Sequence, residues 1–385
     1  MKWQEKIKNL TKNPWSHLIF LALLLALFYG QTSFNLMAGG WYQLFVEKIV
    51  DEGQIDFSLP GFHGADFITL PIYYFFRSSR STAILDIAAA FLNIFLIYLA
   101  VKEIFKNKKF GIFAAYLYLL NPFTYANAFR GDHHTPMITF TLLGLYLLFK
   151  NSKLAFFAFG LSYISRPFAV ALFPLFIYRN KIRQFILSLS IPLIYVIAEY
   201  WQTGKIMIGE HPDFTPANLF SLKRFALNLI YAFQNYFSVH NYSFLNSVAP
   251  GDMIHLSPFI SFLALIGILN YKKYFPDKKL FYSLLISAAI ALFIPASFYH
   301  LDMWYLWVFN FLLILLALPV LVKFTKIIPL VALSFFFQFF YVYLTYRHIF
   351  WNGYGIFLIP GAILIVSLIY LASQFLANRQ NNYNA

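Results

Sequence analysis

Arg130, Asp132, His133 and His134 form the densest group of chemically active side chains in the chain. A cation, a carboxylate and two imidazoles stand directly before an apolar stretch of helical length. Because the first backbone N–H groups of a helix attract anions, the group predicts an anion site with a base beside it. The alternative is a simple membrane boundary, where the aspartate caps a helix and the arginine reaches the lipid headgroups.

Arg166 and Asp66 are the next candidates. Arg166 stands between two short apolar runs, where an arginine is costly unless it faces a cavity, an anion or the membrane surface. Asp66 returns to the membrane surface among apolar residues at the end of a long polar loop. Such an acid suits a general base that removes a proton from an attacking hydroxyl. The same loop contains competing acids, which are Glu47, Asp51, Glu52 and Asp56.

His300 with Asp302, and Arg347 with His348, are weaker candidates for substrate binding. Each pair lies in a short polar connection, where solvated side chains are the more common finding. No metal site is predicted, because the two adjacent histidines before the apolar stretch point in different directions and no H-E-x-x-H pattern or spaced Asp cluster occurs. The sequence requires no cofactor, and it leaves open a divalent cation, Mg²⁺ or Mn²⁺, held by an acid or a histidine.

The composition is that of a membrane protein. Hydrophobic residues make up 60% of the 385-residue chain and charged residues 11%, whereas soluble domains carry about 25% charged residues. The net charge of +14 comes from Lys and Arg in scattered short turns, so it predicts membrane topology and no nucleic-acid partner. The absence of cysteine excludes disulfides, thiol nucleophiles and thiolate metal sites.

The charges alternate between two kinds of connection. Every second polar segment is short and basic, and these segments hold most of the 29 Lys and Arg residues but few of the 15 acids. The other connections hold the remaining acids and nearly all of the histidines. Because Lys and Arg stay on the cytoplasmic side during insertion, the pattern predicts a multi-pass protein of the plasma membrane. Both termini are expected inside, and the titratable residues are expected on the extracytoplasmic face.

The apolar stretches predict about twelve, and at least ten, transmembrane helices in one integral membrane domain, residues 1–385. The expected fold class is therefore an all-α polytopic membrane protein. A full span needs about 20 residues, so the two shorter stretches that flank Arg166 are expected to form a pair of short or tilted helices. The stretches are 15–32, 82–101, 110–122, 136–149, 154–165, 167–178, 184–201, 258–270, 280–297, 303–322, 327–346 and 354–376.

Two long outer loops, residues 31–80 and 202–257, separate these helices. Each contains a segment with apolar residues at helical spacing, at 40–52 and at 217–237. Loops of this length in compact proteins are usually functional or disordered, and the stripes predict amphipathic helices in the membrane interface. Such helices either cap the bundle or hold a membrane lipid, and the pattern does not separate these roles.

Two segments resemble the GT-C superfamily of membrane glycosyltransferases, which use polyprenyl-phosphate-linked sugars at the non-cytoplasmic face. Residues 39–76, GGWYQLFVEKIVDEGQIDFSLPGFHGADFITLPIYYFF, are similar to its first outer loop. Residues 129–179 are similar to the Arg-Gly-acid element and following helices of dolichyl-phosphate-mannose-dependent mannosyltransferases. The resemblance implies transfer of a mannose-like hexose from a polyprenyl-phosphate donor to a glycan, lipid or protein acceptor. It makes Arg130, Asp132 and Arg166 candidates for the donor phosphate and the active-site face, and the adjacent histidines are expected to assist there.

The chain departs from the family pattern at one position. The family's catalytic aspartate usually lies at the very start of the first loop, whereas residues 35–41 here contain no acid. Asp66, Asp132 or another loop acid therefore supplies the base, or the transfer needs none, or the chain is inactive. Three functions remain open: a glycosyltransferase, a catalytically inactive scaffold in glycan assembly, and a flippase or transporter of lipid-linked sugars. A transporter is disfavoured, because the apolar stretches carry few ionisable residues away from their ends.

Overall fold

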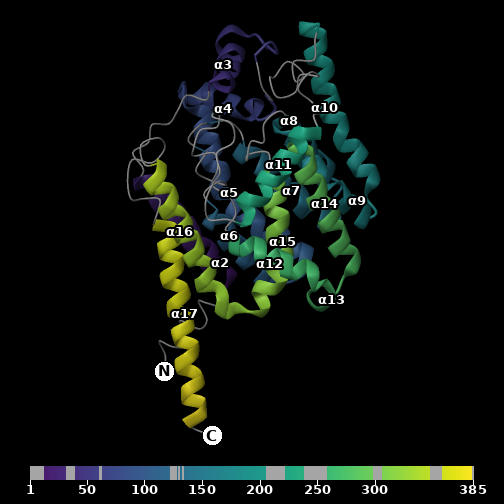
Figure 1. Ribbon diagram of the computed structural model, residues 1–385. Coiled ribbons are helices and arrows are strands. Elements are labelled where there is room, and N and C mark those ends of the chain that lie inside the picture. Colours follow the sequence, from purple (N-terminus) through teal and green to yellow (C-terminus); the bar gives the residue numbers. More distant parts are fainter. Residues whose placement is uncertain are drawn as a thin grey trace.

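The computed structural model describes residues 13–31, 40–59, 63–121, 128, 131, 134–204, 222–237, 258–297, 306–346 and 358–383. Within these ranges every regular element is a helix, and most of the helices pack side by side (Figure 1). In chain order they are α2 (Pro14–Gln31), α3 (Trp41–Glu47), the π-helical turn η1 (Lys48–Glu52), α4 (Asp66–Phe76), α5 (Ser81–Phe105), α6 (Lys108–Leu120), α7 (His134–Phe149), α8 (Ala155–Ser165), the 3₁₀ turn η4 (Pro167–Leu172), α9 (Phe173–Tyr178), α10 (Ile182–Thr203), α11 (Leu222–Phe237), α12 (Pro258–Leu269), α13 (Tyr271–Tyr274), α14 (Lys278–Ala296), α15 (Trp307–Lys323), the 3₁₀ turn η8 (Thr325–Ile327), α16 (Ile328–Tyr346) and α17 (Leu358–Tyr383).

The described helices include segments suited to crossing a membrane. The helices α5, α10 and α14 are each long and apolar enough. A fourth span results if Trp307–Lys323 and Thr325–Phe337, which meet at 111°, are counted as one. Several other apolar helices have 10–17 residues. Every apolar stretch predicted from the sequence contains a helix. Within the described residues three or four of these helices have the length and composition of a full span, so the expected ten to twelve spans stay a prediction.

The helices α15 and α10 are both apolar, and they occupy different surroundings. Almost every residue of α15 is buried, and the helix packs against α12, α14 and α6. α10 packs mainly on α8, and the rest of its surface exposes large apolar side chains, among them Ile186, Leu193 and Ile194. A helix that is apolar on all sides is stable in a protein core or in hydrocarbon. The exposed face of α10 therefore fits a position against lipid.

The apolar region 154–178 is broken at Arg166. The helix α8 ends at Ser165, and Arg166 adopts an extended backbone with φ −163° and ψ 129° before a 3₁₀ turn begins at Pro167. A residue before proline is sterically biased to an extended conformation, and proline lacks the N–H that would continue the helix. The expected pair of short helices is present, and the break leaves the arginine at a helix end.

The helices α3 and α4 lie at one end of the molecule, near the C-terminal end of α10, and the short α13 lies at the opposite end (Figure 1). The helix predicted over residues 40–52 is present as α3 followed by η1. Its apolar side chains face inward, and Phe45 is fully buried. The stripe therefore attaches the first outer loop to α8 and α10. This small second core comprises Phe45, Phe57, Leu59, Ile164 and Tyr195.

Candidate functional site

The first outer loop meets α8 and α10 at the end of the molecule that carries α3 and α4. Of the residues predicted to act, Asp66 and Arg166 lie in this region, and His134 begins α7 as a buried residue. The structure therefore brings one predicted acid and one predicted cation into the same region. The other candidates lie outside the described residues: Arg130, Asp132, His133, His300, Asp302, Arg347 and His348.

Asp66 forms a buried pair with His63. The aspartate begins α4, and its Oδ2 lies 2.6 Å from Nδ1 of the histidine. The exposed fractions of the two residues are 0% and 1%. A buried carboxylate is stable only when it is paired or hydrogen-bonded, and the histidine three residues earlier meets that need. Sequence analysis identified the acid but not this partner, because a single loop histidine carries no pattern that marks it.

Two acceptors fix the protons of His63. Its Nε2 lies 3.0 Å from the carbonyl oxygen of Leu59. Because a carbonyl oxygen only accepts hydrogen bonds, Nε2 carries a proton. A second proton lies between Nδ1 and Oδ2 of Asp66. In this arrangement Nε2 is therefore not open to remove a proton from a substrate.

Two aromatic rings contact the imidazole of His63, and a third aromatic side chain holds its backbone. The Phe45 ring stacks on it with a centroid distance of 4.1 Å and an interplanar angle of 11°. The Tyr42 ring lies 5.6 Å away, and the backbone N–H of His63 donates to the Tyr195 hydroxyl over 3.3 Å. Phe45 and Tyr42 belong to α3, and Tyr195 belongs to α10. The histidine therefore joins the loop to both helices.

Gly64 attaches the loop to the end of α8. Its backbone N–H donates to the carbonyl oxygen of Ile164 over 3.1 Å. A Cβ atom at this position would lie 2.4 Å from Cγ1 of Ile164 and 2.6 Å from its carbonyl carbon. These distances are far below van der Waals contact, so only glycine allows the close approach. Asp66 follows Gly64 by two residues, and Arg166 follows Ile164 by two residues. The contact between Gly64 and Ile164 therefore sets the relative positions of the acid and the arginine.

Arg166 is held by Tyr42. Its Nη2 donates to the tyrosine hydroxyl over 2.7 Å, and its Cζ lies 5.7 Å from the centroid of the same ring. The arginine is partly exposed, in contrast to the buried His63 and Asp66. Guanidinium groups bind phosphate and carboxylate through paired N–H donors. A partly exposed guanidinium at a fixed position therefore suits an anion site.

The helix α10 adds an acid that sequence analysis did not assign to this region. Glu199 is 1% exposed and lies one helical turn after Tyr195. Glu199, Asp66 and Tyr42 all lie within electrostatic range of the Tyr195 hydroxyl. The signal that could have found Glu199 is its four-residue spacing from Tyr195 in an otherwise apolar helix, which places both on one face.

Polar contacts fix the loop that precedes His63. The side-chain amide of Gln202, on α10, accepts from the N–H of Phe57 over 2.8 Å and donates to the carbonyl of Ile55. The Lys48 ammonium donates to Asp56, and this hydrogen bond lowers the pKa of the Asp56 carboxyl to about 2. Asp56, one of the competing acids, is therefore engaged in holding the loop.

Gly131, the described glycine of the Arg-Gly-Asp-His-His segment, lies against the first turn of α5. Its φ is +61°, and a Cβ atom there would lie 2.5 Å from Oγ1 of Thr82 in the first turn of that helix. The backbone N–H of Thr82 in turn donates to Gln43 of α3 over 3.3 Å. Gln43 is next in the chain to Tyr42, which holds Arg166. Contacts through Thr82 and Gln43 therefore link Gly131 to the helix that positions Arg166.

The described residues contain no group of three or more histidine, aspartate or glutamate side chains that could hold a metal ion. The divalent cation that the sequence leaves open stays a prediction. Comparisons of the chain with protein-family models, with curated proteins and with solved structures give no match.

These contacts form a continuous series from the partly exposed Arg166 through Tyr42 to the buried His63–Asp66 pair. Each side chain is locked by its neighbour, which is the condition for a rigid binding site. The arrangement is suited to binding an anion at its outer edge. It presents no accessible carboxylate from Asp66, so proton removal from a substrate requires another acid or an opening of the pair.

Proposed function

We propose that the chain is a multi-pass membrane glycosyltransferase that transfers a hexose from a polyprenyl-phosphate-linked donor to a glycan, lipid or protein acceptor. The observation that carries the proposal is the position of Arg166, a partly exposed guanidinium that Tyr42 holds beside the buried His63–Asp66 pair. The leaving group of a polyprenyl-phosphate sugar is a phosphate anion. A fixed guanidinium stabilises the charge that develops on this group during transfer.

The proposal includes a GT-C-like topology. Ten to twelve helices cross the plasma membrane, both termini are cytoplasmic, and the first outer loop lies on the extracytoplasmic side. The positions of α3 and α13 at opposite ends of the molecule support this sidedness (Figure 1). The acidic first loop carries α3, whereas α13 carries Lys272 and Lys273, as expected for a cytoplasmic turn.

In this proposal Arg166 and Arg130 bind the donor phosphate, and the histidines that follow Asp132 assist them. The burial of Asp66 assigns it a positioning role, because it acts on Arg166 through His63 and Tyr42. Asp132 is then the general base that accepts the proton of the acceptor hydroxyl as it attacks the anomeric carbon. The sugar–phosphate bond breaks, and the phosphate leaves on the lipid.

Sugar transfer by the purified protein tests these roles. The donors are polyprenyl-phosphate-mannose and polyprenyl-phosphate-glucose, and the variants are Asp66→Asn, Asp132→Asn and the control Asp56→Asn. We expect Asp132→Asn to lower kcat by about 100-fold or more, the effect of losing a general base. Asp66→Asn should raise KM for the donor more than it lowers kcat, and Asp56→Asn should retain activity. A collapse of kcat in Asp66→Asn alone would make Asp66 the base and would show that the buried pair opens.

A catalytically inactive scaffold is the second candidate. The burial of Asp66, together with the hydrogen bond from His63 to the Leu59 carbonyl, favours it, because neither side chain meets a substrate in this arrangement. Donor binding by the wild type without transfer of either sugar would support the scaffold and contradict the enzyme. No matching observation favours a transporter, since the buried acids Asp86 and Glu199 lie near the ends of α5 and α10.

A further inference from the structure

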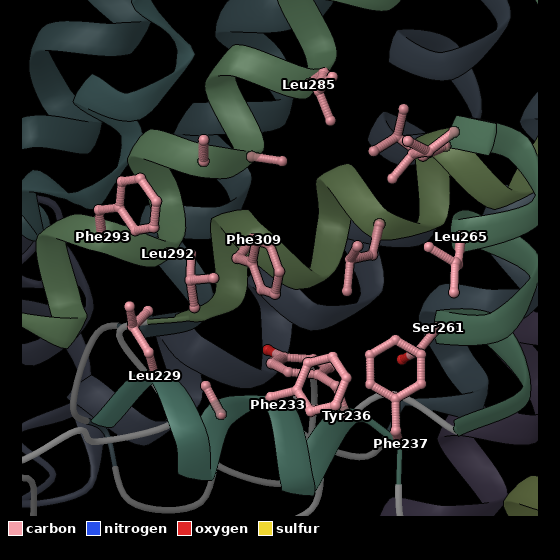
Figure 2. A pocket seen from close by; sticks show the side chains of 16 residues that line it. Leu229, Phe233, Tyr236, Phe237, Ser261, Leu265, Leu285, Leu292, Phe293 and Phe309 are labelled. Atoms are coloured by element: carbon pink, nitrogen blue, oxygen red, sulfur yellow. The ribbon is translucent and has the colours of Figure 1, made fainter. Parts of the chain in front are cut away.

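A cavity of about 440 Å³ lies beneath α11, between this helix and α12, α14 and α15 (Figure 2). The helix predicted over residues 217–237 is present from Leu222 onwards, and residues 217–221 lie outside the described part. Its apolar stripe supplies one wall of the cavity, including Leu229 and Phe233. None of the lining residues belongs to α3, α4, α8 or α10. The cavity is therefore separate from the region of Arg166 and Asp66.

The cavity lining is almost wholly hydrocarbon. Of the 16 side chains that surround it, only those of Tyr236 and Ser261 carry a polar atom (Figure 2). The Tyr236 hydroxyl donates to Oδ1 of Asn310. The Ser261 residue is 2% exposed, and its hydroxyl has no hydrogen-bond partner among the described residues. A buried hydroxyl without a partner is costly, so the Ser261 hydroxyl is suited to donate to an acceptor on a ligand.

Hydrocarbon fits this cavity better than water or empty space. A buried water needs about two to four polar partners, which this lining does not provide. An empty space of this size loses the packing contacts of its walls, and its volume is in the range of ligand sites, about 300–1,000 Å³. Phe233, Leu265 and Phe293 are exposed at its edge. The cavity therefore opens on the apolar outer surface of the bundle, where a lipid chain can enter.

We propose that this cavity binds one acyl chain of a membrane phospholipid, whose ester carbonyl accepts a hydrogen bond from Ser261. Ser261 lies in the first turn of α12 and the lining residue Ile268 in its last turn. The chain therefore extends about 10 Å along this helix from the hydroxyl, at 1.5 Å per residue. A polyprenyl phosphate would place an anion at Ser261, and the lining contains no lysine or arginine to pair with it.

Native mass spectrometry of the full-length protein in detergent tests the proposal. The probes are dioleoyl phosphatidylethanolamine, its dialkyl ether analogue, which lacks the carbonyls, and a polyprenyl phosphate. Ser261→Ala removes the hydroxyl, and Ala289→Phe fills the cavity from α14. Ala226→Phe is the matched control, because Ala226 is exposed on α11 and does not line the cavity. Thermal unfolding of each variant checks that it folds.

We expect the wild type to bind the ester lipid about fivefold more tightly than the ether lipid, the effect of one neutral hydrogen bond. Ser261→Ala should bind both lipids equally. Ala289→Phe should weaken both by about tenfold or more, the effect of leaving two methylene groups unburied, and Ala226→Phe should change neither. Equal binding of ester and ether lipids by the wild type would overturn the proposal, and so would polyprenyl phosphate binding that Ala289→Phe weakens as strongly as it weakens phospholipid binding. Because the readout is binding, the result is independent of whether the protein transfers sugars.

Discussion

In the first outer loop, the imidazole of His63 contacts an acid, a carbonyl group and two rings, and Gly64 leaves no room for a single methyl group. Beneath α11, by contrast, carbon side chains enclose a cavity of about 440 Å³, and the hydroxyl of Ser261 has no partner among the described residues. Hydrogen-bond geometry defines the first region, and apolar volume defines the second.

This difference separates two ways of recognising a ligand. The loop region is pre-organised, so it can fix the position of one charged group on Arg166 at little further entropic cost. The cavity offers contact area without directional contacts, so it should accept chains of similar length and shape. A substitution that adds volume should therefore be harmful in the first region and tolerated in the second.

The largest expected effect is on stability: enlarging a side chain should destabilise the loop region but not the cavity region. Gly64→Ala should lower the free energy of unfolding by about 1–3 kcal/mol, because its methyl group overlaps Ile164. Ala289→Phe adds a larger group but should leave stability near that of the wild type, since the cavity accommodates it. Thermal unfolding in detergent measures both. Gly30→Ala is the control, because a Cβ there has no atom within 4 Å. Equal stability of Gly64→Ala and the wild type would break the comparison.

A smaller effect is expected from Tyr42→Phe, which keeps the ring beside His63 and removes the hydroxyl that holds Arg166. The affinity for polyprenyl phosphate should fall roughly tenfold, because hydrogen bonds to charged groups are worth about 1.5–3 kcal/mol. Tyr74→Phe is the control at an exposed tyrosine. Phospholipid binding beneath α11 should be unchanged in both variants. An unchanged affinity of Tyr42→Phe for the phosphate would show that the guanidinium does not need this tyrosine.

The smallest effect concerns pH. The pKa of Asp56 is lowered to about 2 by its hydrogen bond from Lys48, whereas an unfolded aspartate has a pKa of about 3.9. The pair therefore stabilises the loop fully above the unfolded value, and this stability is lost as the pH falls towards 2. The gap in unfolding temperature between wild type and Asp56→Asn should stay constant from pH 7 to about pH 5 and should narrow as the pH falls from about 4 towards 2. Phospholipid binding should not change over this range, because no Asp, Glu or His lines the cavity. A gap that does not narrow in this way would contradict the assigned role of Asp56.

Local patterns in the sequence located the helices and the break at Arg166, because apolar spacing and a proline act within a few residues. They did not locate the series that joins Arg166 to Tyr42 and His63. These residues are separated by long stretches of chain, and only the close approach of Gly64 to α8 brings them together. Sequence analysis singled out Asp66 for proton transfer, but its burial depends on the packing of α3 and α10 around the loop, which no local pattern specifies.

The cavity shows the same limit for packing. The apolar stripe of α11 was visible in the sequence, and a role in holding a lipid was one of its two interpretations. The volume of the cavity depends on the side chains that four helices direct into one shared space. Small residues there, among them Ala232, Ala288 and Ala289, leave part of that space unfilled. Apolar periodicity indicates which face of a helix is buried, but it does not indicate whether side chains fill the space against that face.

The side chain of Gln202 bonds to the backbone of Ile55 and Phe57 in the way that a neighbouring β-strand would. It lies at the end of α10, whose exposed apolar face is suited to lipid. Helices with such faces adjust their tilt to the thickness of the surrounding hydrocarbon. A change in the tilt of α10 would therefore reach residues 55–57 and, through Tyr195, His63. If α10 crosses the bilayer, as its length and composition allow, the bilayer thickness would act on the geometry around Arg166.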